Sequence, residues 1–205
     1  ALDDELSWLA LMRHHGAPTR LLDWTKSPYV AAFFAASEAT REKPSAIWAI
    51  DQSAILHHAV ALLCPDGGGL AAGHPSAALL GDAEYFVPIF FRHTTVPLVA
   101  PVEPSTTNER QVIQQGIFLC SSSMQWGWGF ETSLKHMLCG CAQSGSYWLY
   151  KLEIYPEARD ELLRELLRMN VSYATLFPGL DGFARSLGTK ASLGSDYFED
   201  HCYPI

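Results

Sequence analysis

The segment from His14 to Pro28 constrains this chain more than any other part of its sequence. It reads His-His-Gly-Ala-Pro-Thr-Arg-Leu-Leu-Asp-Trp-Thr-Lys-Ser-Pro and crowds imidazoles, a guanidinium, a carboxylate and hydroxyls between apolar flanks. A Gly-x-Pro turn begins the segment and a Ser-Pro step ends it. Because glycine permits a left-handed turn and proline cannot continue a preceding helix, we expect this segment to join two packed helices.

The flanking residues predict those helices. Apolar residues recur at helical spacing over 2–15, and Gly16 is placed to end that helix. Residues 19–24 favour a short strand. Ser27 is a good N-cap with Pro28 at the first helical position, so a second, buried helix is expected from Pro28 to about residue 40.

The rest of the chain predicts an α+β fold, because helices and strands do not alternate regularly. We expect a single mixed α/β domain over residues 1–205, with a central, largely antiparallel sheet flanked by helices. A Gly-rich surface loop is expected at 65–75 and an irregular tail at 190–205. Further strands are predicted at 46–50, 86–91, 96–102, 117–120 and 147–154, and further helices at 53–63, 109–115, 131–138, 156–169 and 180–187, with Asn108 and Asp181 as N-caps.

Composition excludes several classes of protein. A chain that is 48% hydrophobic and 18% charged can bury a core, and a net charge of -8 argues against nonspecific nucleic-acid binding. No apolar run reaches the length of a membrane span. The odd count of 5 cysteines favours reduced thiols in a cytoplasmic compartment. The acidic start at residues 1–5, without an initiator Met, predicts an additional N-terminal segment of the same protein.

The central segment supplies candidate functional residues, and each has a structural alternative. Arg20 either grips an anionic ligand or is a structural charge that needs a partner. His15 and Asp23 are the local acid-base candidates. The structural alternatives are a helix C-cap or a core imidazole for His15, and for Asp23 a buried charge that the backbone or a partner satisfies. The remaining candidate ligand-binding residues are Thr25, Ser27, Gln114 and Gln115.

A metal site is not predicted. His136, Cys139 and Cys141 form His-x-x-Cys-x-Cys, but tetrahedral structural zinc needs four ligands and no second pair has a suitable spacing.

Segments spread over most of the chain resemble the FRG domain family, bacterial domains of largely unassigned function. They are His-His-Gly-Ala-Pro-Thr-Arg-Leu-Leu-Asp-Trp-Thr from His14, Asn-Glu-Arg from Asn108 with Gln-Gln-Gly-Ile-Phe from Gln114, and Leu-Phe-Pro-Gly-Leu-Asp-Gly from Leu176. The strand and helix at 147–169 fall where the family has such a pair. The aromatic-Arg-Gly motif that names the family is not present in this chain.

A weaker likeness links the chain to arginine-type ADP-ribosyltransferases. Trp24-Thr25-Lys26-Ser27-Pro28, leading into Ala31-Ala32-Phe33-Phe34-Ala35, is similar to their Ser-Thr-Ser strand and following helix. Gln114 and Gln115 lie where those enzymes place a catalytic Glu, and an amide does not replace a carboxylate in that role.

Two functions remain open from sequence. In the first, His15, Arg20, Asp23, Thr25, Ser27 and Gln115 build one pocket for an anionic nucleotide-like ligand such as NAD. Arg20 would hold the diphosphate, and Thr25 and Ser27 would bond the ribose or nicotinamide side. In the second, the chain is a non-catalytic structural or protein-interaction domain whose polar cluster stabilises the fold.

Overall fold

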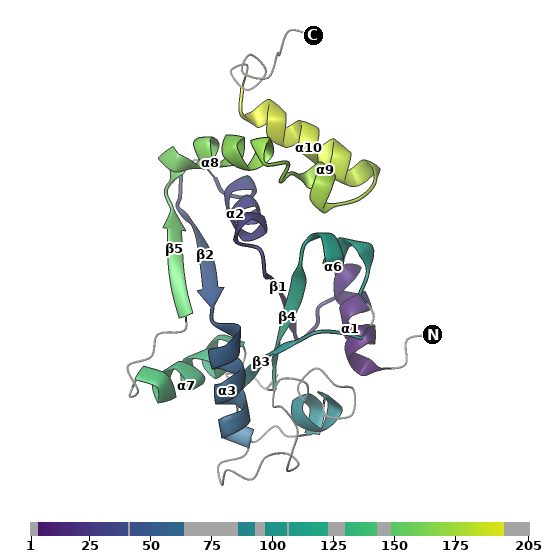
Figure 1. Cartoon of the computed structure of the whole chain (residues 1–205), viewed down its shortest axis with the longest axis vertical. Coiled ribbons are helices and arrows are strands. Elements are labelled where there is room, and N and C mark those ends of the chain that lie inside the picture. Colours follow the sequence, from purple (N-terminus) through teal and green to yellow (C-terminus); the bar gives the residue numbers. More distant parts are fainter. Residues whose placement is uncertain are drawn as a thin grey trace. The chain divides into compact units, whose positions relative to one another are not determined.

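The computed structural model describes residues 4–40, 42–63, 86–92, 97–105, 107–122, 130–142 and 149–194 (Figure 1). Helices and antiparallel strands are both present, which confirms the predicted α+β class. The predicted Gly-rich loop at 65–75 lies outside the described residues, as does residue 195 onward in the predicted tail. Within the described part of the chain, no helix has both the length and the apolar character needed to cross a membrane.

Most elements form close to where the sequence predicts them. In chain order they are α1 Glu5–His14, β1 Leu21–Thr25, α2 Pro28–Ser37, β2 Ser45–Ile50, α3 Gln52–Leu63, the π-helix η1 Pro88–Arg92, β3 Val99–Val102, α6 Glu109–Ile113, β4 Gly116–Ser121, α7 Phe130–Ala142, β5 Leu149–Ile154, α8 Pro156–Arg168, α9 Tyr173–Leu176 and α10 Leu180–Ser192.

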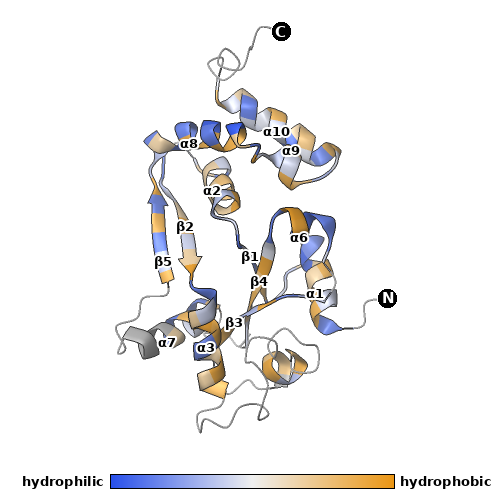
Figure 2. Ribbon diagram, viewed as in Figure 1, coloured by the Kyte–Doolittle hydropathy of each residue, from blue (hydrophilic) through white to orange (hydrophobic). Residues whose placement is uncertain are grey.

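The described strands form two sheets, whereas one central sheet was predicted. One sheet has three strands in the order β1-β4-β3, and the other pairs β2 with β5. In the first, β3 and β4 are antiparallel, with Val99 opposite Ser121 and Val102 opposite Phe118. Most of β4 is buried and it is drawn mainly orange in Figure 2, whereas most of β5 is exposed. The three-stranded sheet is thus the one built around a buried strand.

The chain divides into two compact units, each with its own hydrophobic core. The first unit comprises Ala1–Trp24, Ala49–Thr107 and Ile117–Tyr150, and the second comprises Thr25–Trp48, Asn108–Gly116 and Lys151–Ile205. Fully buried Phe86, Phe90 and Leu98 belong to the first core, and Phe33 and Leu163 to the second. The assignment of residues 1–205 to a single domain stays a prediction.

Asp4 fixes the start of α1. Its carboxylate accepts hydrogen bonds from the backbone N–H of Ser7 at 2.6 Å, the hydroxyl of Ser7 at 2.9 Å and the hydroxyl of Ser105 at 2.8 Å. Burial by itself raises the pKa of Asp4, but these hydrogen bonds outweigh burial and hold the pKa below its usual value. Asp4 is thus the N-cap of α1, and its charge lies at the positive end of the helix dipole.

Residues 86–92 are helical, so the strand predicted at 86–91 is wrong. Phe86, Ile89 and Phe90 are buried, and this i, i+3, i+4 spacing is that of a helix facing a core. The rings of Phe86 and Phe90 lie 4.9 Å apart. Pro88 is the first residue of η1 and follows two residues that are already helical.

Helix α10 begins at Leu180 with Gly179 as its N-cap, so the prediction that Asp181 is the N-cap is wrong. Gly179 has a φ of 109°, a conformation that aspartate and other L-residues rarely adopt. The glycine therefore takes the N-cap position, and the helix starts before Asp181. Asp181 instead lies in the first turn, where its charge suits the helix dipole. The helix also continues to Ser192, beyond the predicted end at Leu187.

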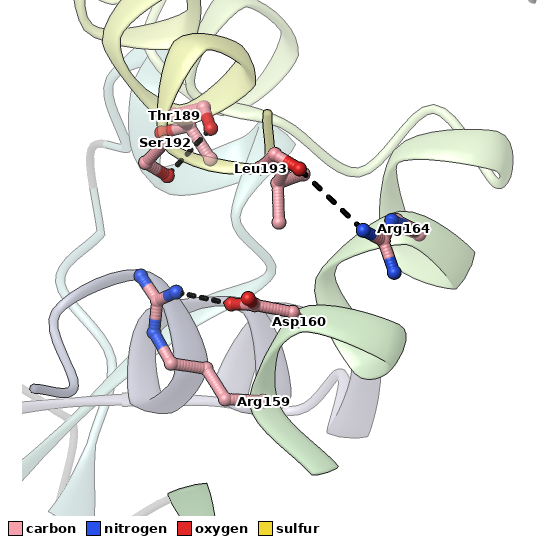
Figure 3. A network of polar contacts seen from close by, with 6 residues as sticks. All are labelled: Arg159, Asp160, Arg164, Thr189, Ser192 and Leu193. Carbon is pink, nitrogen blue, oxygen red and sulfur yellow. Dashed lines mark hydrogen bonds and ion pairs between the residues drawn. The ribbon is translucent and has the colours of Figure 1, made fainter. Parts of the chain in front are cut away.

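Polar contacts link α8 to the end of α10 (Figure 3). The guanidinium of Arg164 donates to the carbonyl oxygen of Leu193, the C-cap of α10, at 3.4 Å. A cation at this position compensates the unpaired carbonyls of a helix C-terminus. On the same helix, the largely buried Arg159 pairs with Asp160 at 2.6 Å.

Gly182 sets the distance between α10 and α9. A Cβ atom at this position would lie 1.9 Å from the carbonyl oxygen of Phe177 and 2.7 Å from that of Tyr173. Both are backbone atoms that cannot rotate away. Glycine is therefore required here for the close approach of the two helices.

We predict that Gly182→Ala lowers the free energy of unfolding by about 3 kcal/mol or more, because the added methyl group displaces α10 from α9. Gly188→Ala on the same helix is the matched control. Its new Cβ meets no atom within 4 Å, so it should raise stability by up to about 1 kcal/mol. Urea unfolding measures both, and equal effects of the two substitutions would contradict the packing role of Gly182.

Candidate functional site

The His-His-Gly stretch forms the end of α1. His15 is the C-cap, and Gly16 has a φ of 82°. The backbone N–H of Gly16 donates to the carbonyl of Arg13 at 2.9 Å, and that of Ala17 donates to Met12 at 3.0 Å. These two bonds are those of a Schellman motif, which satisfies the last carbonyls of a helix. The exposed ring of His15 makes an edge contact with His14, with ring centroids 5.1 Å apart, and its predicted acid-base role stays a prediction.

Arg20 is held by the π-helix η1. Its guanidinium donates to the carbonyl oxygen of Phe90 and lies over the ring of Phe91, 4.2 Å from the ring centroid. A π-helix leaves its carbonyls in an unusual register, and here a side chain from another element satisfies one of them. The partner that sequence reasoning required for Arg20 is therefore a backbone carbonyl and an aromatic ring.

Asp23 forms an exposed ion pair with Arg13 of α1. The Nε atom of Arg13 donates to Oδ2 of Asp23 at 2.7 Å, and the Asp23 side chain is 59% exposed. An exposed pair of this kind contributes at most about 1 kcal/mol. The predicted catalytic role of Asp23 stays a prediction.

The hydroxyl of Thr25 makes two hydrogen bonds. The hydroxyl donates to the carbonyl oxygen of Gln114 at 2.7 Å and accepts from the backbone N–H of Ser27 at 3.0 Å. Ser27 in turn caps α2 through its side chain, which accepts from the N–H of Val30 at 3.4 Å. Both predicted ligand-binding hydroxyls therefore have roles in the fold, and the predicted cap at Ser27 is confirmed.

The two glutamines end α6 in different ways. The side-chain amide of Gln114 donates to the carbonyl oxygen of Leu176 in α9 at 2.9 Å. Gln115 has a φ of 49°, a left-handed conformation that costs a non-glycine residue about 1 kcal/mol. Its carbonyl oxygen accepts the backbone N–H of Lys26 at 2.9 Å. The backbone of Gln115, rather than its exposed side chain, thus connects α6 to the start of α2.

The structure brings part of the predicted site together. Thr25, Ser27, Gln114 and Gln115 form one hydrogen-bonded group in the second unit. His15, Arg20 and Asp23 belong to the first unit, where each has its own partners. A single pocket formed by all of these residues stays a prediction.

Sequence reasoning missed a second group of polar residues, around Phe177. The guanidinium of Arg110 lies 4.1 Å from the Phe177 ring centroid, and that of Arg185 lies 5.8 Å from it. Phe177 lies in the third resembling segment, Arg185 follows that segment by three residues, and Arg110 belongs to the second segment. Nothing in the sequence relates Arg110 to Phe177, so only the fold shows that these side chains meet.

Among the residues that the structure describes, no group of three or more His, Cys, Asp or Glu side chains could hold a metal ion. The side chains of Cys139 and Cys141 lie outside that description.

The structure is that of an α+β protein in which the capped helix α1 is followed by the strand β1 and the capped helix α2. Residues 1–44, which include α1, β1 and α2, match the family model of the FRG domain. The match confirms the resemblance predicted from the His-His-Gly segment. No curated protein and no solved structure matches the chain.

Cys120 is a fully buried free thiol on β4. Burial raises the pKa of this thiol from 9.0 to about 12, and the positive charge of Arg20 opposes the rise only in part. The thiol is therefore protonated and unreactive in the folded protein, because the thiolate is the nucleophile.

The shifted pKa of Cys120 predicts alkaline instability. The unfolded chain releases the thiol proton near pH 9.0 and the folded chain only at about 12, so the stabilising effect is complete below pH 9.0 and is lost as the pH rises toward 12. Urea unfolding over this pH range should show the free energy of unfolding falling more steeply for the wild type than for Cys120→Ala. Parallel slopes for the two proteins would contradict the buried thiol.

Proposed function

We propose that this chain is a non-catalytic protein-interaction domain in which the polar segment from His14 to Pro28 serves as structural framework. The observation that carries the proposal is the use of the segment's polar groups within the fold. The hydroxyl of Thr25, which would face a ligand in a nucleotide site, is engaged both as donor and as acceptor.

The cationic candidate supports the same proposal. One N–H of Arg20 is engaged by the Phe90 carbonyl, and the face of its guanidinium covers the ring of Phe91. A diphosphate bound by Arg20 would have to use the remaining N–H groups or displace these contacts. The framework role requires no such rearrangement.

The two glutamines, Gln114 and Gln115, also support the proposal. A residue that orients a reacting centre in an ADP-ribosyltransferase is a carboxylate, whereas Gln114 bonds a carbonyl through a neutral amide. Gln115 contributes its backbone to the fold. NAD binding is therefore the competing hypothesis. We also propose a reducing, cytoplasmic environment, which the buried free thiol of Cys120 supports.

The framework role predicts a specific loss of stability. Arg20→Ala should lower the free energy of unfolding by about 2 kcal/mol, because it leaves the Phe90 carbonyl without its donor and removes the cation from the Phe91 ring. Arg13→Ala is the matched control, and its exposed ion pair should contribute at most about 1 kcal/mol. Thermal and urea unfolding measure both variants. Unchanged or increased stability of Arg20→Ala would favour a ligand-binding arginine instead.

Gln115 separates the two hypotheses further. Gln115→Gly removes the side chain and keeps the left-handed backbone, so the free energy of unfolding should change by no more than about 1 kcal/mol. Isothermal titration calorimetry with NAD on the wild type and on this variant tests the ligand side chain directly. We expect no binding heat from either protein. NAD binding by the wild type that is lost in Gln115→Gly would establish the nucleotide pocket and overturn the proposal.

A further inference from the structure

We infer that two copies of this chain associate through the outer edges of their β5 strands, which pair antiparallel about a two-fold axis at Leu152. The inference goes beyond the proposed function, because β5 shares no residue with the polar segment from His14 to Pro28. The partner is a second copy of the chain, and the surface is the edge of a strand.

Strand β5 has one neighbour among the strands that the structure describes. It pairs with β2 in a two-stranded sheet, and Figure 1 shows β2 along one side of β5. In the described part of the chain, the other side of β5 is therefore the edge of a sheet. The backbone N–H and C=O groups of an edge strand can pair with a strand of another molecule. Two-stranded sheets gain most from such an addition, because stable sheets usually have three or more strands.

The exposed side chains of β5 are apolar on one face and charged on the other. Tyr150 and Leu152 are 55% and 52% exposed, and they share a face because they lie two residues apart. Lys151 and Glu153 share the opposite face, where their side chains form an ion pair at 2.6 Å. The ammonium group of Lys151 also lies 6.0 Å from the ring centroid of the exposed Trp48 in β2. Large apolar side chains on a sheet edge favour burial against another strand.

The order of residues along β5 is complementary to itself when the strand is reversed. In an antiparallel pair centred on Leu152, Lys151 of one copy lies opposite Glu153 of the second copy, and the two-fold axis repeats this pair. On the other face, Leu152 lies opposite Leu152 and Tyr150 lies opposite Ile154. Opposite charges and apolar side chains that face each other across two strands both stabilise the pairing.

The charges also select this register against its neighbours. A pair centred on Lys151 places two lysines opposite each other, and a pair centred on Glu153 does the same with two glutamates. Like charges directly opposite each other destabilise a strand pair. The edge of β2 has no such selection, because its sequence Ser-Ala-Ile-Trp-Ala-Ile is uncharged. We therefore assign the contact to β5. Since six residues of strand form a small contact, we expect a weak dimer of the transient class.

Sedimentation velocity of the full chain, over about a hundredfold range of concentration, tests the association. We expect the weight-average mass to rise from that of a monomer toward that of a dimer. Lys151→Glu and Glu153→Lys each place like charges opposite each other twice, so each variant alone should associate at least about tenfold more weakly. An equimolar mixture of the two variants should form heterodimers, because every altered charge then faces its opposite. This recovery also shows that both variants are folded.

Cysteine cross-linking tests the position of the axis. Directly opposed residues of antiparallel strands have Cα atoms about 4.5–5.5 Å apart, a separation that suits a disulfide. Under mild oxidation, Leu152→Cys should therefore give more covalent dimer on a non-reducing gel than the wild type. Leu187→Cys on α10 is the matched control, because Leu187 is also 52% exposed. It should cross-link no more than the wild type.

Several results would exclude this dimer. They are a mass that stays monomeric at every concentration, single charge variants that associate like the wild type, a mixture of the two variants that does not recover association, and equal cross-linking of Leu152→Cys and Leu187→Cys. A chain that stays monomeric would identify Lys151 as a charge that protects a sheet edge. None of these results changes the stability expected for Arg20→Ala, so failure of the dimer is distinguishable from failure of the proposed function.

Discussion

The contact between residues 25–27 and the end of α6 is the constraint on which the second unit depends. Thr25 donates to the Gln114 carbonyl at 2.7 Å, and Lys26 donates to the Gln115 carbonyl at 2.9 Å. These bonds place Ser27 where it caps α2, and the Gln114 side chain then reaches the carbonyl of Leu176 in α9. Segments remote in sequence are thus joined through backbone carbonyls, which explains why polar residues concentrate there.

Polar residues spent on such contacts are poor candidates for chemistry, because a buried or half-buried hydroxyl has few donors and acceptors to share. The use of these polar groups in the framework explains why the most recognisable stretch of the sequence, which lies within the residues that match the FRG domain model, carries turn and cap residues.

Local signals in the sequence predicted most of the elements. Ser27 and Asn108 cap their helices and Gly16 ends α1 as expected, because capping depends on residues only a few positions apart. The helix at 86–92 was missed because its apolar residues are nearly continuous and its segment is short, so period 2 and period 3.6 are hard to separate. The partners of Arg20 and Gln114 could not be predicted either, since each is a carbonyl that any residue type supplies.

The close approach at Gly182 also limits how the chain tolerates changes in length. Adding one residue between Phe177 and Gly182 would turn α10 by about 100°. A residue with a side chain would then face the Phe177 carbonyl, and the glycine would face solvent. Related sequences that keep this helix pair should therefore hold the Phe177–Gly182 spacing constant.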